Sequence, residues 1–396
     1  MIRTAVSVLA LAGLAGTALA QPTLAPLSSF GSNGWRAPSV ILAGDSPTSN
    51  DGTNYLALGT GNLERGLAFN PSTGNLILVT RNGAITGQAS PVRVLSGTSG
   101  RDLGGMPLGT GVVAGGTFVY NKVGVADDGA IYMSNMVADA RTGAGNTFKV
   151  YRWSDEAATA PTTVFNGNLG TGASTGVRVG DSLDISGSGA NTRMVFGHQT
   201  AAGYTVLTGD TSPTAATYVG GTTPSGSLPI TGTGNNQFRL GITFAGPGND
   251  VWGRAPSQPV FRSTFSGSAA AVNSSFATTS AGEGAMDYIT INGTSYLALL
   301  DTNNSRVRIY DVTGPAAVEL TNLSTTIGTL TGNGNATGDV RFGAVTLDQN
   351  GFAKVSIYAM STNQGIQAFE FFTIPTPGAA GVLAMGGLLA ARRRRR

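Results

Sequence analysis

A repeated unit is the feature that most restricts the fold of this 396-residue chain. Each copy has a short apolar segment, a turn of Asn, Asp or Gly type, and a second segment rich in β-branched and aromatic residues. The six first segments start at residues 66, 124, 182, 241, 287 and 343, with separations of 58, 58, 59, 46 and 56 residues. Such a period is typical of folds that stack one small sheet per unit.

Further strands are predicted in each unit. Third strands are expected at 91–95, 148–153, 204–208, 259–265, 306–312 and 366–372. Fourth strands are expected at 118–121, 162–165, 217–220, 272–276 and 318–323, with none in the sixth unit. Four-stranded sheets at this period indicate an all-β fold, namely a β-propeller. Six blades are expected, and seven blades are the alternative.

The ring needs a closing strand, because exposed sheet edges invite aggregation. We expect the isolated apolar segment 39–43 to pair with the third strand of the sixth unit. The Gly-rich stretch 97–116 is expected to be a long loop in the first blade. A β-sandwich or a β-helix is the alternative, but a sandwich would show a linker between domains of about 100 residues and a β-helix a shorter repeat.

The two ends predict processing signals around a single domain at residues 21–374. Residues 1–20 combine Arg3, an apolar stretch and the small residues Ala18 and Ala20, which is the plan of a secretory signal peptide. Residues 375–396 contain Pro375 and Pro377, an apolar segment at 378–391, and five arginines from Arg392 to Arg396. The apolar segment is shorter than the ~20 residues that span a bilayer comfortably.

This C-terminal pattern resembles the PEP-CTERM signal of bacteria that carry an exosortase, although Thr376 stands where the family has Glu. The resemblance implies that the tail engages the inner membrane and a sorting protease transiently. It also implies a secreted protein delivered to the cell surface or extracellular matrix of a Gram-negative-type bacterium. An anchor that is never cut is the alternative.

Charge and composition exclude several classes of protein. The chain has 24 Lys+Arg and 21 Asp+Glu, and six of the cations lie in the two ends, so the body carries a net charge of about −3 without a basic stripe. We therefore expect no nucleic-acid partner. The absence of cysteine and the single histidine, His198, exclude thiolate chemistry and multi-histidine metal sites.

Part of the body resembles a propeller-type domain of unknown function found in secreted bacterial proteins. The resemblance rests on Arg65 to Asn70, Val125 to Tyr132, Tyr151 to Pro161 and Arg178 to Gly189, over about residues 65 to 190. It implies the fold and a secreted setting, and it implies no activity.

A cation stands next to or two residues before the glycine of the first strand in five units. First strands line the channel of a propeller, so these cations can converge and bind an anionic or sugar-like ligand. The alternative is that each cation ties neighbouring blades together. The predicted ligand-binding residues are Arg65, Lys122, Arg178, Asp181, Arg239, Asp287 and Arg341.

No resident cofactor is expected, although calcium is possible. The weak calcium candidates are Asp301, Asn303, Asp348 and Asn350, where ordinary turn formation is the alternative. No motif for a catalytic nucleophile or a nucleotide-binding loop is present. Carboxylates such as Asp181 and Asp184 could serve a glycosidase or lyase, but the sequence does not give the distance between them.

These features together predict a monomeric, non-enzymatic β-propeller that binds to, or forms part of, an extracellular polymer matrix. An exopolysaccharide or surface glycan is the expected partner. A secreted glycosidase or lyase with its site at the channel mouth is the alternative.

The processing prediction can be checked by one mass measurement. The secreted protein should begin at Gln21 and end near Pro375, because the A-x-A site and the Pro-containing motif mark the two cuts. A mass that includes residues 378–396 would instead indicate an uncut anchor.

Overall fold

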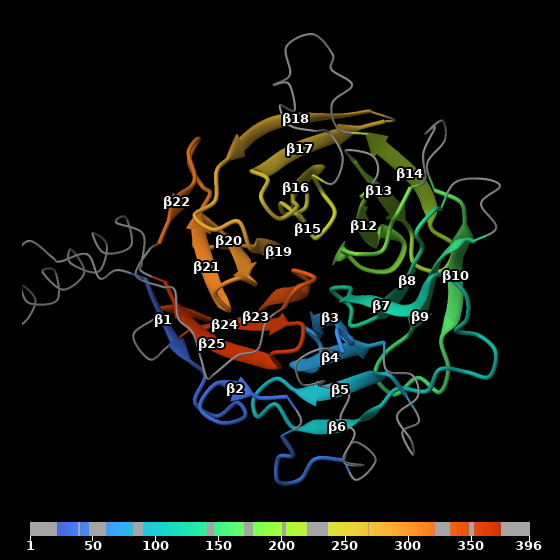
Figure 1. Ribbon diagram of the computed structural model, residues 1–396, viewed down its shortest axis with the longest axis horizontal. Coiled ribbons are helices and arrows are strands. Elements are labelled where there is room, and N and C mark those ends of the chain that lie inside the picture. Colours follow the sequence, from blue (N-terminus) through green and yellow to red (C-terminus); the bar gives the residue numbers. More distant parts are fainter. Residues whose placement is uncertain are drawn as a thin grey trace, which may run out of the picture.

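The computed structural model describes residues 22–38, 40–46, 61–81, 90–140, 146–169, 177–199, 203–219, 237–267, 269–320, 333–347 and 352–373. These residues form six antiparallel sheets around a central channel, as a six-bladed β-propeller (Figure 1). The predicted all-β fold and blade number are confirmed. The predicted processing residues Ala18, Ala20, Pro375, Pro377 and Arg392 lie outside the described residues.

The first three blades each contain four strands in chain order from the channel outward. Blade 1 has β3 (Glu64–Phe69), β4 (Asn75–Thr80), β5 (Val92–Ser96) and β6 (Asp102–Gly105). Blade 2 has β7 (Phe118–Val125), β8 (Ile131–Met136), β9 (Phe148–Trp153) and β10 (Thr162–Gly167). Blade 3 has β11 (Asp184–Ser186), β12 (Arg193–Gly197), β13 (Gly203–Thr208) and β14 (Thr214–Val219), with a 3-10 turn at Gly189–Asn191.

The next two blades repeat this order, and the sixth is completed by the N-terminus. Blade 4 has β15 (Gly241–Phe244), β16 (Asp250–Arg254), β17 (Val260–Ser266) and β18 (Ala269–Phe276). Blade 5 has β19 (Glu283–Ile291), β20 (Thr294–Asp301), β21 (Arg306–Asp311) and β22 (Val318–Glu319). Blade 6 has β23 (Gly338–Leu347), β24 (Ala353–Ser361) and β25 (Ile366–Phe372), to which β1 (Thr23–Pro26) and β2 (Trp35–Arg36) pair.

An N-terminal strand closes the ring, but the predicted segment was wrong. Strand β1 pairs antiparallel with β25, with Leu24 opposite Phe371. Residues 40–43 form no strand, and Val40 and Ile41 are 39% and 49% exposed. Instead, Leu42 donates its backbone N–H to the Asp45 carboxylate at 2.8 Å, which bends the chain into a turn.

The fourth strand of blade 1 also differs from the prediction. Residues 118–121 belong to β7, the first strand of blade 2, and the fourth strand is β6 inside the predicted loop. The buried carboxylate of Asp102 accepts two hydrogen bonds from Arg93 on β5, at 2.9 and 3.0 Å. This ion pair fixes β6 in a stretch too rich in glycine to show an alternating pattern.

Hydrophobic clusters fill the spaces between neighbouring blades. Six clusters of buried residues each join side chains from two adjacent blades, and together they account for every interface around the ring. The cluster between blades 5 and 6 includes Phe371 and receives the half-buried Leu24 of β1. Within the described part of the chain, no helix has the length and apolar character needed to cross a bilayer.

The first strands converge on the channel so closely that side chains are excluded at some positions. A Cβ atom on Gly66 would lie 2.7 Å from the backbone nitrogen of Val123, and one on Gly241 would lie 2.1 Å from the carbonyl oxygen of Gly284. The glycines of the repeat therefore allow contact between first strands of adjacent blades.

We predict that Leu24→Asn destabilises the protein by about 1–2 kcal/mol, because it places an amide against the apolar interface of blades 5 and 6. The same change at the exposed Ile41 should have an effect near zero. Urea unfolding of the two variants provides the measurement. Equal destabilisation would contradict the assignment of β1 as the closing strand.

Candidate functional site

Arg341 from β23 crosses the channel and joins three blades. Its Nη1 donates to Asp184 at 2.9 Å, its Nη2 donates to the Leu183 carbonyl at 2.8 Å, and its Nε donates to the Leu67 carbonyl at 3.0 Å. The side chain is 7% exposed. Although burial opposes its charge, the carboxylates of Asp339, Asp184 and Asp287 raise the pKa of Arg341 above its usual value.

Lys122 from β7 adds a second cation to this channel network. Its Nζ donates to the Gly338 carbonyl at 2.7 Å and to Asp339 at 3.2 Å, while Asp339 also accepts the Leu67 backbone N–H at 3.0 Å. Burial lowers the pKa of Lys122, and the Asp339 carboxylate opposes this effect. Both Lys122 and Arg341 thus bind atoms of other blades across the channel.

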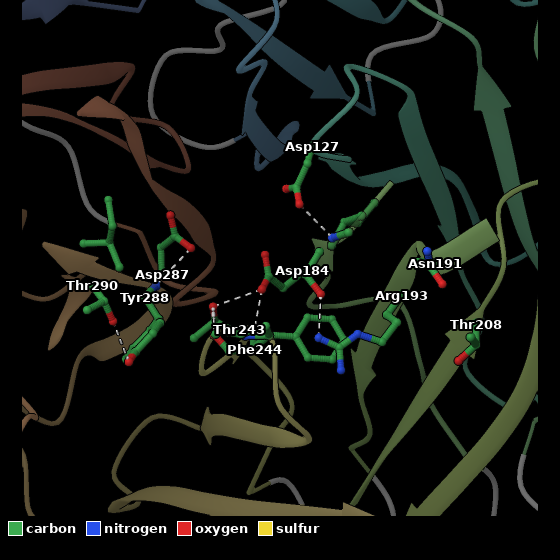
Figure 2. Close-up of a pocket in the computed structure, with 16 residues that line it drawn as sticks. Asp127, Asp184, Asn191, Arg193, Thr208, Thr243, Phe244, Asp287, Tyr288 and Thr290 are labelled. Atoms are coloured by element: carbon green, nitrogen blue, oxygen red, sulfur yellow. Dashed lines mark hydrogen bonds between the residues drawn. The ribbon is translucent and has the colours of Figure 1, made fainter. Parts of the chain in front are cut away.

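A cavity of about 780 Å³ opens where the first strands of blades 3, 4 and 5 turn into their second strands. A second space of about 250 Å³ shares Asp127, Asp184, Asp287 and Tyr288 with it, so the two lie next to each other. We call this end of the channel the hairpin mouth. In Figure 2, Asp287, Tyr288 and Thr290 lie on one side, Asn191, Arg193 and Thr208 lie on the other, and Asp184 lies between them.

Two carboxylates of the hairpin mouth are held by backbone donors. Asp184 accepts the Phe244 N–H at 2.8 Å and the Thr243 hydroxyl at 3.0 Å. Asp287 accepts the Phe342 N–H at 2.7 Å and lies 4.0 Å from Arg341. Burial, together with the negative charge of Asp184, outweighs Arg341 and raises the pKa of Asp287 to about 7.

The remaining wall of the cavity offers hydroxyl and guanidinium groups. The hydroxyl of Tyr288 bonds the hydroxyls of Thr290 at 2.9 Å and Ser295 at 2.7 Å. The guanidinium of Arg193 lies 4.7 Å from the centre of the Phe244 ring and donates to Ser186 at 3.1 Å. Such paired hydroxyls and fixed charged groups can bind a polyhydroxylated molecule.

The structure divides the seven predicted ligand-binding residues into two groups. Three belong to the channel network and the hairpin mouth, and four lie at the opposite end of the first strands, which we call the strand-start mouth. The first group contains Lys122, Asp287 and Arg341, and the second contains Arg65, Arg178, Asp181 and Arg239.

The calcium candidates show ordinary turn and ion-pair contacts where they are described. Asp301 accepts the backbone N–H groups of Asn303 and Asn304 and an N–H of Arg308 at 3.2 Å. Asp348 and Asn350 lie outside the described residues. Among the residues described, no group of three or more histidine or acidic side chains is arranged to hold a metal ion.

His198 is buried and bonds Thr205 through Nε2 at 2.9 Å. Burial lowers its pKa to about 4, so the imidazole is neutral at pH 7. It lies on the backbone bridge to Val179 rather than in the hairpin mouth.

The sequence analysis named Asp184 only as one of a pair of carboxylates, and it did not identify Arg193, Tyr288 and Thr290 as site residues. A signal for the last two exists, because they follow Asp287 on the first strand of blade 5. Arg193 starts a second strand and gave no such signal.

Comparison with known proteins supports the fold. The model of DUF4623, a domain of unknown function, matches residues 44–223, which hold blades 1 to 3. The expected resemblance to a propeller-type domain of unknown function is thereby confirmed. No curated protein matches the chain.

Two solved structures are similar to the chain. A DUF4623 family protein from Bacteroides eggerthii DSM 20697 has a TM-score of 0.60 and 18% identity, covering 81% of this chain and 72% of that one. The major Malassezia sympodialis allergen Mala s 1 has a TM-score of 0.49 and 10% identity, covering 81% of this chain and 97% of that one. The first of these supports the fold alone.

We predict that Asp287 makes the protein less stable as pH rises. Its pKa near 7 in the folded state lies above the ~3.9 of an unfolded aspartate, so the folded state holds the proton more tightly and stability falls between about pH 4 and 7. The slope reaches at most about 1.4 kcal/mol per pH unit. Urea unfolding at pH 5 and pH 8 should show a smaller difference for Asp287→Asn than for the wild type.

The exposed Asp155 provides the control, since Asp155→Asn should keep the wild-type pH dependence. An unchanged pH dependence in Asp287→Asn would show that this carboxyl is ionised throughout.

Proposed function

We propose that this protein is a secreted, surface-delivered β-propeller that binds a glycan of the extracellular matrix in the hairpin mouth, without catalysis. The observation that carries the proposal is the cavity of about 780 Å³, whose wall combines carboxylates, hydroxyls and the Arg193 guanidinium. These groups can donate to and accept from sugar hydroxyls. The signal-peptide pattern and the PEP-CTERM-like tail support the extracellular setting.

The cavity has the dimensions of a ligand site rather than of a packing defect. Pockets for small molecules have volumes of about 300–1,000 Å³ and few fixed polar groups. Asp184 and Asp287 are held by backbone N–H groups, so their positions are set before a ligand arrives. This preorganisation favours binding because little side-chain entropy is lost.

A glycan array on the purified protein, followed by calorimetry with the best oligosaccharide, tests the proposal. Tyr288→Phe removes a hydroxyl from the cavity and should weaken binding about 5- to 10-fold, the cost of one hydrogen bond. Tyr120→Phe on β7 is the matched control, because Tyr120 does not line the cavity, and it should bind like the wild type. A folded protein that binds no glycan would leave a purely structural role.

A second candidate, a glycosidase or lyase, is favoured by one observation. Asp287 has a pKa near 7 and lines the same cavity as Asp184, and a neutral acid beside a carboxylate is the arrangement used in glycoside hydrolysis. Release of reducing ends from the bound oligosaccharide, lost in Asp287→Asn, would establish this activity. Binding without turnover would exclude it for that ligand.

A further inference from the structure

The strand-start mouth gathers four arginines around two acids. Arg178 binds Asp181 through Nε at 2.6 Å and Nη2 at 3.0 Å, and Arg239 reaches the same carboxylate through Nε at 3.1 Å. Arg65 donates to Thr337 from the neighbouring blade at 2.6 Å. Two guanidinium groups therefore share one carboxylate, with a third beside them.

Arg81 joins this cluster through Asn121. It donates its Nε to the Asn121 side-chain oxygen at 2.9 Å, and Asn121 in turn donates to the Gly180 carbonyl, next to Asp181. The Arg81 guanidinium also lies 3.4 Å from the centre of the Phe118 ring. Arg81 is thus held in place without a carboxylate of its own among these contacts.

Among the residues that the structure describes, this cluster has more positive than negative charge. Its cations are Arg65, Arg81, Arg178 and Arg239, and its acids are Asp181 and Glu64. Glu64 is buried and accepts the Asn363 N–H at 3.1 Å. Burial first, and then the nearby charges of Arg65 and Arg178, lower the pKa of Arg81 to about 9 against the opposing charge of Asp181.

Two further observations indicate that the surplus charge can receive a ligand. The side chains of Arg178 and Arg239 are 28% and 26% exposed, so a molecule at the mouth can reach them. Arg65 is 5% exposed, and its buried Nε has no hydrogen-bond partner among the described residues. A buried donor without a hydrogen-bond partner among several cations is costly, and an anion that occupies the mouth reduces the repulsion between those cations.

We propose that the strand-start mouth binds the carboxylate or sulfate groups of an acidic polysaccharide, with Arg178 and Arg239 as the contacting residues and Arg65 and Arg81 as positive charges behind them. The guanidinium edge matches an oxyanion with two or more oxygens in bidentate geometry. Because Arg239 uses Nε for Asp181, its two terminal nitrogens are not needed for that ion pair. This site lies at the other end of the first strands from the glycan cavity and does not depend on it.

Calorimetric titration of the full chain at low salt with sodium D-glucuronate and with sodium sulfate tests the site, with D-glucose as the neutral probe. At least one of the two anions should bind, and added salt should lower its affinity. The anion with the higher affinity indicates whether carboxylate or sulfate groups of the polysaccharide make the contact. Binding of neither anion would overturn the proposal.

Variants of Arg239 locate the site. Arg239→Gln should weaken anion binding about 10-fold, because one charge-assisted contact is lost. Arg239→Lys keeps the positive charge but loses the pair of nitrogens that binds an oxyanion in bidentate geometry. Its affinity for the anion should therefore lie between that of the wild type and that of Arg239→Gln. Arg178→Gln provides a second variant if Arg239→Gln fails to fold, as judged by circular dichroism.

Arg262→Gln is the matched control, since Arg262 is also a partly exposed arginine paired with one aspartate, Asp250, but on outer strand β17. It should bind both anions like the wild type. Equal loss in Arg262→Gln and Arg239→Gln would overturn the proposal, as would an unchanged affinity in Arg239→Gln. Tyr288→Phe should leave anion binding intact, so failure of this site and failure of the glycan cavity remain distinguishable.

Discussion

The contact between Arg341 and the backbone of blades 1 and 3 is the constraint on which the centre of the propeller depends. A buried guanidinium is tolerated only when its donors are satisfied, and here two carbonyl groups and the carboxylates of Asp184 and Asp339 satisfy them. Truncating Arg341 would leave Asp184 as a buried acid without its cation, whereas Asp339 would keep its ion pair with Lys122. The first strands can approach one another because glycines such as Gly66 leave room, and the polar network then fixes how closely they meet.

This network separates the channel into two mouths of different chemistry. Toward the hairpins, the first strands end in hydroxyls and carboxylates, and burial raises the pKa of Asp287 to about 7. At the other end, arginines outnumber acids around Asp181 among the described residues. One mouth therefore suits neutral polyhydroxylated molecules and the other suits oxyanions. A polysaccharide with both sugar hydroxyls and acidic groups offers both chemistries, so the two proposed sites are suited to different parts of such a polymer.

The repeat predicted most of the blades because strand alternation and turn residues are local signals. Strands 148–153 and 366–372 have the predicted bounds. The closing strand was wrong because the choice between two N-terminal segments depends on tertiary packing: Leu24 lies against the interface of blades 5 and 6, whereas the more apolar segment 40–43 turns at Asp45. Strand β6 was missed because its glycines hide the alternating pattern, and the buried pair Arg93–Asp102 that fixes it is not visible in sequence.

The five cations were predicted to form one ring, but they lie at different positions along the channel. The residue at which each first strand begins explains the difference. Arg178 and Arg239 precede β11 and β15, so they lie in the connections at the mouth. Lys122 and Arg341 also lie two residues before their glycines, but β7 and β23 begin earlier, at residues 118 and 338. Both cations are therefore part of the strand and lie inside the channel. Because the side chains of a strand alternate between its two faces, a shift in where the strand begins changes what a residue contacts. The same sequence position in the repeat thus produces a blade-linking cation in one unit and a ligand-accessible one in another.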